Sequence, residues 1–475
     1  MSLPTFQARY FSAPRTRNAI YYSWQQLMQR VGVTDVLASE INIYYQPIEQ
    51  LQPRPPAIVI IPCCETAWDD LLALPPNSIS TLEASTVLPP DASLPWDEPT
   101  PVPFWGCGYG NRQFPFAERY QDGIVVFYAD IIATTLFMLS RWEETVLPDR
   151  DQHGRFPAAS SVAYKQGFLD RPIVDEYALI LRTWLQTILP DFELKPQTFS
   201  VKLSHDIDYI RSYLTYKKVI RSLRNALLKK RDLCQFWQVL KNVVWQVSYP
   251  SKSPYYQRIR WLAQMSQQHN LESVFNFITA DPTPMNRQKY DLSSRLMQQC
   301  LRDLRELGAE IGLHAGYDTF NDPDKLKQEK TRLEKFLGSQ KKASGGRQHY
   351  LRFQVPETWR YWEQADLSYD STMSYAAYEG FRCGTCHPFR PFDIELDRTL
   401  DLMELPLIIM DQTLRNYRMM TPEQGERRII ELAQKCKQVE GIFTMLWHNT
   451  SLDGEWEPWL PVYERVLYVL EAMQV

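Results

Sequence analysis

Glycine is scarce in this chain of 475 residues, with 18 copies, and the sequence contains no flexible low-complexity tract. A long uncharged apolar run is also missing. The most apolar window, residues 123–140, contains Asp130 and predicts a helix buried in protein rather than a membrane span. No basic stretch followed by an apolar region opens the chain, so we predict no signal peptide. The eight cysteines are scattered, which favours reduced thiols and a cytoplasmic protein.

No excess of charge of one sign marks the whole chain, which has 52 basic and 56 acidic residues and a formal net charge of −4. This balance argues against a protein whose whole surface binds nucleic acid. The hydrophobic fraction of 44% and the charged fraction of 23% are those of an ordinary globular protein. At about 150 residues per domain, the length predicts about three domains or two large ones.

The chain divides into two predicted units near residue 195. Residues 1–195 contain proline-rich connectors and a single histidine, His153, and they predict a smaller α/β accessory domain without a catalytic group. In residues 196–475 strand and helix patterns alternate, which predicts a parallel α/β architecture. The predicted strands are 199–203, 273–278, 309–313, 400–405 and 442–446, and the predicted helices are 258–269, 292–307, 323–337 and 422–439.

A basic helical insertion, residues 209–246, follows the first of these strands. It contains nine lysines and arginines and a single acid, Asp232. Two interpretations are open for it. It is either a solvated helical hairpin, or a contact site for an anionic partner such as a membrane surface or a phosphate-bearing glycan carrier.

Histidines and carboxylates follow three of the predicted strands, at the point where each strand ends. His205 lies with Asp206 and Asp208 after the first strand, and His314 and His448 follow two later strands. Because the carboxyl ends of parallel strands meet at one edge of a sheet, we expect these side chains to lie close together. Imidazole and carboxylate groups bind Zn²⁺ and, with more oxygen ligands, Mn²⁺, Co²⁺ or Fe²⁺. The sequence therefore predicts a divalent metal site.

Five short motifs carry these residues in a fixed order. They are Ser204-His-Asp-Ile-Asp208, Glu310-Ile-Gly-Leu-His314, Arg352-Phe-Gln-Val-Pro356, Tyr369-Asp370-Ser371 and Leu446-Trp-His448. Their order and spacing resemble those of the polysaccharide deacetylases (carbohydrate esterase family four), over residues 200–475. Residues 380–385 and 387–389 are similar to a bacterial branch with an added N-terminal domain, a role that residues 1–195 fit. The resemblance implies a distorted (β/α) barrel.

The resemblance implies a metal site that includes Asp208 and His314. The second family motif has a further histidine four residues after the first, where this chain has Asp318. Asp318 is therefore one candidate ligand, and His349 is another because it could supply the missing imidazole. His205 is either a ligand or a residue that holds a ligand in place. The expected metal is zinc, with manganese, cobalt and iron as alternatives.

The resemblance also implies catalytic roles. Asp206 would be the base that accepts a proton from water, and His448 the general acid. Because Ile207 separates Asp206 from the next acid, whereas the family has two adjacent acids, the roles of the two acids could be exchanged. Arg352 would orient the base, and Asp370 would tune a histidine.

The expected function is removal of N-linked, or O-linked, acetyl groups from a carbohydrate or glycan precursor of the cell envelope. Two alternatives stay open. The irregular second motif, with Asp318, is compatible with an inactive carbohydrate-binding or scaffold protein on the same fold. The third hypothesis is an amidohydrolase that acts on a small non-sugar amide. We expect no nucleic-acid partner, no transmembrane segment, and peripheral membrane contact only through residues 209–246.

Overall fold

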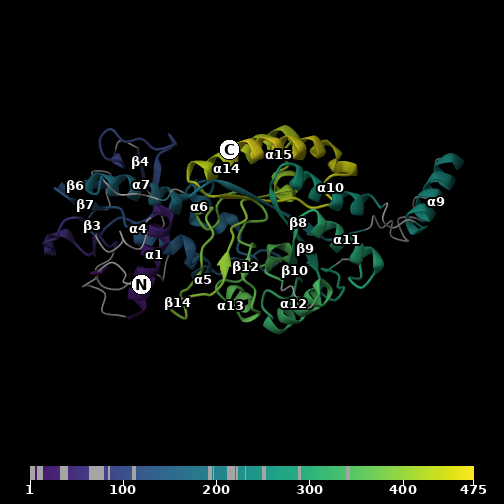
Figure 1. Ribbon diagram of the computed structural model, residues 1–475, viewed down its shortest axis with the longest axis horizontal. Coiled ribbons are helices and arrows are strands. Elements are labelled where there is room, and N and C mark those ends of the chain that lie inside the picture. The colour runs from purple at the N-terminus through teal and green to yellow at the C-terminus, as the bar shows by residue number, and fades with distance from the viewer. Residues whose placement is uncertain are drawn as a thin grey trace.

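The computed structural model describes residues 6–7, 14–32, 41–63, 80–83, 86–109, 114–190, 195, 197–210, 220, 223–229, 232–248, 253–286, 290–338 and 343–474. Within these ranges the strands form a five-stranded sheet in the N-terminal part and an eight-stranded sheet in the remainder (Figure 1). Two short antiparallel pairs complete the strand inventory of the described residues. No helix in these ranges is long and apolar enough to cross a membrane.

The smaller sheet has the strand order β1-β2-β3-β7-β6, in which only β6 is antiparallel to its neighbour. Its strands are β1 (Phe6–Gln7), β2 (Asn42–Tyr45), β3 (Ala57–Ile60), β6 (Ala117–Gln121) and β7 (Ile124–Phe127). The helices of this part are α1 (Pro14–Val31), α4 (Ile131–Leu139), α5 (Trp142–Val146), α6 (Val162–Lys165) and α7 (Ile173–Ile188). A separate pair joins β4 (Ser80–Leu82) to β5 (Thr100–Val102).

The larger sheet is parallel throughout and has the order β15-β12-β11-β10-β9-β8-β17-β16. Neighbouring strands in the sheet are also consecutive in the sequence, with β17 returning to lie beside β8, as in a barrel. In the described residues β15 and β16 are not paired, so the sheet is a curled half-barrel. Its strands are β8 (Ser200–Ile207), β9 (Glu272–Ile278), β10 (Glu310–Ala315), β11 (Gly345–Gln348), β12 (Tyr369–Asp370), β15 (Met403–Glu404), β16 (Ile409–Met410) and β17 (Ile442–Leu446).

Helices alternate with these strands, as the sequence pattern predicted. They are α9 (Leu233–Ser248), α10 (Pro254–Gln268), α11 (Arg295–Glu306), α12 (Pro323–Leu337), α13 (Glu357–Gln364), α14 (Pro422–Gln438) and α15 (Leu460–Gln474). Local chemistry fixes where several of them begin. The side chain of Asp322 caps α12, and Thr421 and Gln424 form a capping box at α14. Both helices have a proline in their first turn, where no amide donor is needed.

A close contact between β10 and β11 determines the geometry of the strand edge. A Cβ atom on Gly346 would lie 1.8 Å from the carbonyl oxygen of Leu313, so only glycine fits at this position. The register then places His314 beside Arg347, while β8 and β9 place Asp206 beside Asn276. Strand β11 begins with two glycines, Gly345 and Gly346, which do not predict a strand, so β11 was not predicted from the sequence.

The segment 123–140 differs from its prediction as a single buried helix. Its first part is the strand β7, and only its second part, α4, is helical. The change occurs at Asp130, whose carboxylate accepts a hydrogen bond from the amide of Ala133 and caps α4. The run Ile124–Phe127 pairs with β3, because β-branched and aromatic residues favour a strand between two neighbours. The whole segment is buried, as predicted, apart from the turn at Gly123.

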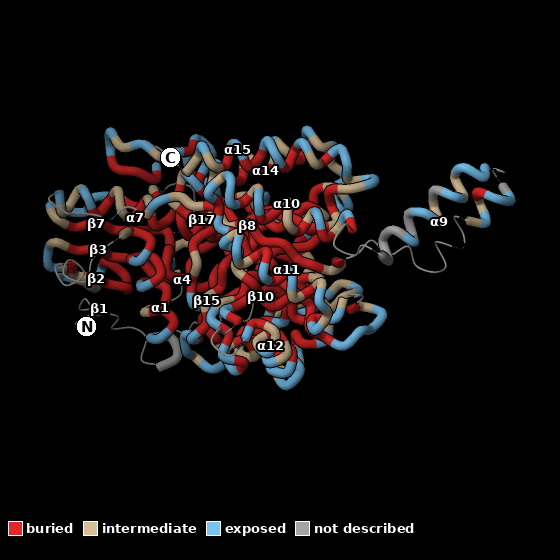
Figure 2. The backbone as a smooth tube through the Cα atoms, turned by 45° about the vertical axis from the view of Figure 1, so that its right-hand side comes forward, coloured by how far each residue is buried: buried red, intermediate tan, exposed pale blue. Residues whose placement is uncertain are grey.

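The predicted insertion 209–246 is described in part. Residues 211–219, 221–222 and 230–231, which carry several of its basic residues, lie outside the described residues. The described part ends in α9, which extends away from the body of the molecule (Figure 2).

The two sheets share one hydrophobic core, which contains buried residues from α1, α4 and α7 as well as from β8, β9 and β10 (Figure 2). Buried ion pairs also join the two parts. Glu144, in α5, accepts hydrogen bonds from Arg141 at 2.9 Å and from Arg382 at 2.6 Å. Burial alone would raise the pKa of Glu144, but these two guanidinium groups outweigh it and lower the pKa. The predicted boundary at residue 195 stays a prediction.

We expect the Glu144→Gln variant to lose about 3–5 kcal/mol of unfolding free energy, because it leaves two buried guanidinium groups without their shared carboxylate. Chemical denaturation measures this loss. The matched control is Glu426→Gln, which removes a carboxylate paired with the largely exposed Arg465 and costs less than about 1 kcal/mol. Equal losses in the two variants would contradict the structural role of the buried network.

Candidate metal centre and active site

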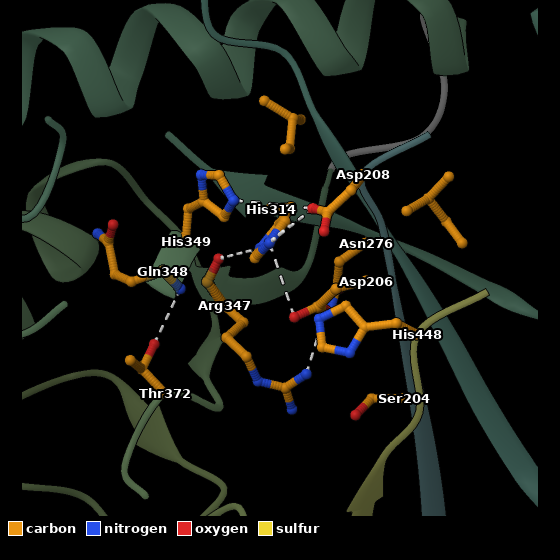
Figure 3. Close-up of polar contacts among 12 residues, drawn as sticks. Ser204, Asp206, Asp208, Asn276, His314, Arg347, Gln348, His349, Thr372 and His448 are labelled. Atoms are coloured by element: carbon orange, nitrogen blue, oxygen red, sulfur yellow. Dashed lines mark hydrogen bonds and ion pairs between the residues drawn. The ribbon is translucent and has the colours of Figure 1, made fainter. Parts of the chain in front are cut away.

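The carboxyl ends of four strands bring ionisable side chains to one cavity (Figure 3). Asp206 and Asp208 come from the end of β8, and His314 from β10. His349 follows β11 directly, and His448 lies two residues after β17. The cavity has a volume of about 180 Å³. The structure thus brings together four of the residues expected at this edge, Asp206, Asp208, His314 and His448, and adds His349, which was named only as an alternative ligand.

Asp208, His314 and His349 form a group whose ligand atoms all lie within 4.8 Å of one another. The Oδ1 atom of Asp208 is 3.8 Å from Nε2 of His314 and 3.7 Å from Nε2 of His349. This Oδ1 atom is buried and accepts no hydrogen bond within the described chain. Burial raises the pKa of Asp208, although the nearby His448 and His314 act in the opposite direction.

The two imidazoles present their Nε2 atoms because their Nδ1 atoms are engaged elsewhere. His314 donates from Nδ1 to the carbonyl oxygen of Arg347 at 3.1 Å. His349 donates from Nδ1 to Oδ1 of Asn286 at 3.2 Å, and burial holds the pKa of His349 well below its usual value. A neutral imidazole whose Nδ1–H is hydrogen-bonded is the form that binds a metal through Nε2. Two imidazoles whose Nδ1 atoms are hydrogen-bonded and one carboxylate with an orphaned oxygen therefore fit a divalent metal.

Asp206 lies next to this group but has different partners. Its Oδ1 atom accepts hydrogen bonds from Arg347 at 3.1 Å and from Asn276 at 2.8 Å. Its Oδ2 atom is 3.7 Å from Nε2 of His314. Burial by itself would raise the pKa of Asp206, but His314, Arg347 and His448 outweigh it and hold the pKa well below the usual range. Asp206 is thus an ionised carboxylate that is held in one orientation.

His448 lines the cavity and is held by Asp411. Its backbone amide donates to Oδ2 of Asp411 at 2.9 Å, and its Nδ1 donates to Oδ1 at 2.8 Å. Burial would lower the pKa of His448, but the Asp411 carboxylate outweighs it and raises the pKa to about 9. The imidazolium form is therefore the resting form at neutral pH, and it can donate a proton.

Four predicted site residues do not line this cavity. His205 donates from Nδ1 to the carbonyl oxygen of Trp447 at 2.8 Å, and its ring packs 4.6 Å from that of Phe275. Burial lowers the pKa of His205 to about 4, so this imidazole beside the site is neutral. The side chain of Asp318 is 53% exposed and lies 3.8 Å from Arg352, outside the metal-binding group.

Arg352 and Asp370 are also absent from the cavity lining. Arg352 donates to the carbonyl oxygens of His153 and Tyr317, both at 2.7 Å, and it is Arg347 that contacts Asp206. Asp370 is buried and accepts hydrogen bonds from the hydroxyl and the amide of Thr372. Burial raises the pKa of Asp370 to about 6. The carboxylate that contacts a histidine of the site is Asp411.

The N-terminal part of the chain reaches this site, which its sequence did not predict. Arg155 lines the cavity and donates to the carbonyl oxygen of Tyr350 at 2.9 Å. His153, predicted as a hydrophilic turn residue, lies with its Nδ1 atom 3.1 Å from the hydroxyl of Tyr317. The turn that contains these residues therefore packs on the loops that surround the metal-binding group.

A second group with metal-binding residue types consists of Asp175, Cys386 and His387. Its polar atoms are already engaged. Asp175 accepts from Arg30 at 2.8 Å and from Thr385 at 2.6 Å, and both ring nitrogens of His387 are hydrogen-bonded. We interpret this group as a buried junction between the two parts of the chain.

Comparisons with known proteins give the following similarities. Residues 14–190 match a family of unknown function, DUF7033. No curated protein matches the chain. Two similar solved structures are described as polysaccharide deacetylases. The one from Mycobacterium smegmatis is 14% identical, and the match covers 58% of this chain and 85% of that chain with a TM-score of 0.37. The one from Pseudomonas aeruginosa is 12% identical, and the match covers 57% of this chain and 84% of that chain with a TM-score of 0.35. A third similar structure is a 4-alpha-glucanotransferase from Thermococcus litoralis. It is 12% identical, and the match covers 58% of this chain and 38% of that chain with a TM-score of 0.32. The side-chain geometry therefore carries the functional interpretation.

We predict that Asp208→Asn and His349→Ala each lower the affinity of the protein for Zn²⁺ by at least about 10- to 100-fold, the loss typical even of residues that only orient a ligand. Elemental analysis after dialysis against limiting zinc measures the retained metal. Asp318→Asn is the matched control and should retain the wild-type amount. Loss of metal in Asp318→Asn together with retention in His349→Ala would reverse the assignment.

Proposed function

We propose that this protein is a metal-dependent hydrolase that removes acetyl groups from a carbohydrate. The observation that supports this function above all is a single cavity that unites three elements. These are a metal-binding group (Asp208, His314 and His349), an ionised carboxylate (Asp206) and a protonated histidine (His448). Hydrolysis of an acetamide needs all three, because water must lose a proton, the carbonyl must be polarised, and the departing amine must gain a proton.

Asp208, His314 and His349 would hold the metal. The chemistry supplied by such an ion, when bound, is polarisation of the acetyl carbonyl and a lower pKa for water. We propose zinc, because two imidazoles and one carboxylate are a ligand set of catalytic zinc sites, which leave one position open for water or substrate.

Asp206 accepts the proton of the attacking water. Its hydrogen bonds from Arg347 and Asn276 hold the carboxylate in one orientation and favour its ionised form. His448 donates a proton to the nitrogen as the carbon–nitrogen bond breaks, so that acetate and a free amine leave. Asp411 holds the imidazole ring and favours its protonated form. An O-acetyl ester would be cleaved in the same way, with an alcohol as the leaving group.

Carbohydrate is the proposed substrate class because of the cavity lining, in which the aromatic rings of Tyr209, Tyr350 and Tyr417 are combined with the amides of Gln348 and Gln412. Rigid rings with polar edges and a few hydrogen-bonding groups suit the faces and hydroxyls of a sugar. We also propose that residues 1–195 act as an accessory domain of this enzyme. A cytoplasmic location and a cell-envelope glycan as substrate remain predictions from the sequence.

The test is acetate release from a panel of N-acetylated sugars, O-acetylated sugars and small amides. We expect release from sugars that stops on chelation and returns with Zn²⁺. His448→Ala should lower turnover by about 10²- to 10⁴-fold, the usual contribution of a general acid. Asp411→Asn should move the alkaline limb of kcat/KM to lower pH, because the loss of its charge lowers the pKa of His448 and the donating form disappears earlier as pH rises.

His269→Ala is the matched control, since His269 pairs with Glu471 at the end of α10, and it should turn over at the wild-type rate. A metal-loaded protein that binds sugars but releases no acetate would support the inactive carbohydrate-binding alternative. Hydrolysis of small amides alone would support the third hypothesis. If the alkaline limb of the kcat/KM profile were unchanged in Asp411→Asn, His448 would not be the general acid.

A further inference from the structure

A second cavity lies beside the active-site cavity. It has a volume of about 360 Å³, and its lining includes residues 151–152 and 155–159 and residues 374–378. Four residues line both cavities: Arg155, Leu351, Ala376 and Tyr417. The two cavities are therefore adjacent compartments of one site, and the N-terminal part of the chain forms a wall of the second compartment.

The lining of the second cavity combines aromatic rings with a few polar groups. The rings belong to Phe156, Tyr375, Tyr378 and Tyr417. Arg155 is 8% exposed, and its guanidinium is fixed by Asp151 at 2.7 Å. A rigid apolar surface with a small number of oriented polar groups is typical of a site for a small polar ring compound.

The volumes of the two cavities indicate how much of a substrate each can hold. The active-site cavity, at about 180 Å³, is below the range of about 300–1,000 Å³ that is usual for ligand pockets, whereas the second cavity is within it. A sugar chain that places one acetylated unit at the metal-binding group has to continue into neighbouring space. The second cavity adjoins the active-site cavity, and its lining includes the polar residues Asp151, Gln152 and Arg155, which an alkyl chain would leave unused.

We propose that the second cavity binds the sugar unit next to the acetylated one, so that the substrate is a saccharide of at least two pyranose units and residues 151–159 contribute to its selection. The inference rests on the proposed deacetylase function. Residues 151–159 belong to the segment 14–190, which matches a family of unknown function. The inference gives this part of the segment a role in substrate binding.

The test compares N-acetylglucosamine with its β-1,4-linked dimer, trimer and tetramer by titration calorimetry and by acetate release. The variant Ala159→Trp fills the second cavity from an exposed position that does not line the first. We expect wild-type protein to bind the trimer at least about tenfold more tightly than the monomer, and Ala159→Trp to lose this gain while its affinity for the monomer is unchanged. Ala472→Trp, at an exposed position of α15, is the matched control.

Each outcome decides between the possibilities. No gain with chain length, no binding of any member, or a gain that persists in Ala159→Trp overturns the inference. A response to a longer N-acyl group in place of a longer sugar chain overturns it in favour of an acyl pocket. Tighter binding of the longer saccharides without acetate release supports the second cavity and overturns the proposed function alone.

A different observation supports a second inference, which concerns residues 220–248. Eleven large hydrophobic side chains are exposed in the described chain, and six of them lie in this segment: Ile220, Leu227, Leu228, Leu233, Trp237 and Val244. Leu233, Trp237 and Val244 are 63%, 63% and 58% exposed and fall within one face of α9 at helical spacing. The helix itself extends from the body of the molecule (Figure 2).

The charge of the same segment indicates the kind of partner. Residues 220–248 contain six lysines and arginines and one acid, Asp232, which caps α9 by accepting from the amide of Gln235. Arg224 and Lys241 are exposed in the described part. An exposed apolar face with a tryptophan and flanking cations is the pattern of a helix that lies in the plane of an anionic lipid surface. Two copies of the segment would instead bring like charges together.

We infer that α9 binds the surface of an anionic bilayer. Co-sedimentation of the full chain with vesicles of phosphatidylcholine and phosphatidylglycerol should recover the protein with the lipid, less so with pure phosphatidylcholine or at higher salt. The triple variant Leu233→Gln, Trp237→Gln and Val244→Gln should lower the bound fraction at least about tenfold. Tyr468→Gln, an exposed residue of α15, is the matched control.

Wild-type protein that stays in the supernatant overturns this inference. So does equal binding to neutral and anionic vesicles, since the basic residues would then have no part in it. Sedimentation velocity without lipid decides the remaining case, because a dimer that the triple variant abolishes would assign the apolar face to a second copy of the chain.

Discussion

The site depends on the Oδ1 atom of Asp208, which lies near two imidazoles and accepts no hydrogen bond from any residue that the structure describes. Removing an ionised group from water without a partner is costly, and a second carboxylate, Asp206, lies close by. The two imidazoles offer the Oδ1 atom of Asp208 no short hydrogen bond, since their Nε2 atoms are 3.7 and 3.8 Å away. A cation between the three groups would remove the cost, and the hydrogen bonds at both Nδ1 atoms leave the two Nε2 atoms directed to it.

The sequence allowed the long, regular elements and the residues at their ends to be predicted. The strands near 273–278 and 442–446 and the helix 323–337 are confirmed, because each combines an apolar pattern with clear boundaries. Asp206, Asp208, His314 and His448 were found by one physical rule, which is that parallel strands end at a common edge. Asp411, directly after the two-residue strand β16, follows the same rule but lay on too short a strand to be recognised.

The remaining site residues depend on packing between distant segments, which has no local sequence signal. Arg347 contacts Asp206 only because β11 approaches β10 closely at Gly346, and a pair of glycines does not predict a strand. The order of motifs favoured Arg352 for this position, although its side chain is held by carbonyl oxygens of two other loops. In the same way, the presence of Arg155 at the cavity depends on the shared core of the two sheets and not on any pattern around residue 155.

The separation of the two acids by one residue fits the geometry of β8. Side chains two residues apart in a strand point to the same side, and the residue between them points to the other. Ile207 is fully buried in the hydrophobic core, while Asp206 and Asp208 both line the cavity. The intervening apolar residue therefore anchors the strand end and lets both carboxylates face the site. Their roles then separate by partners: the donors Arg347 and Asn276 favour Asp206 as a carboxylate held for proton transfer, and the orphaned oxygen of Asp208 favours a metal ligand.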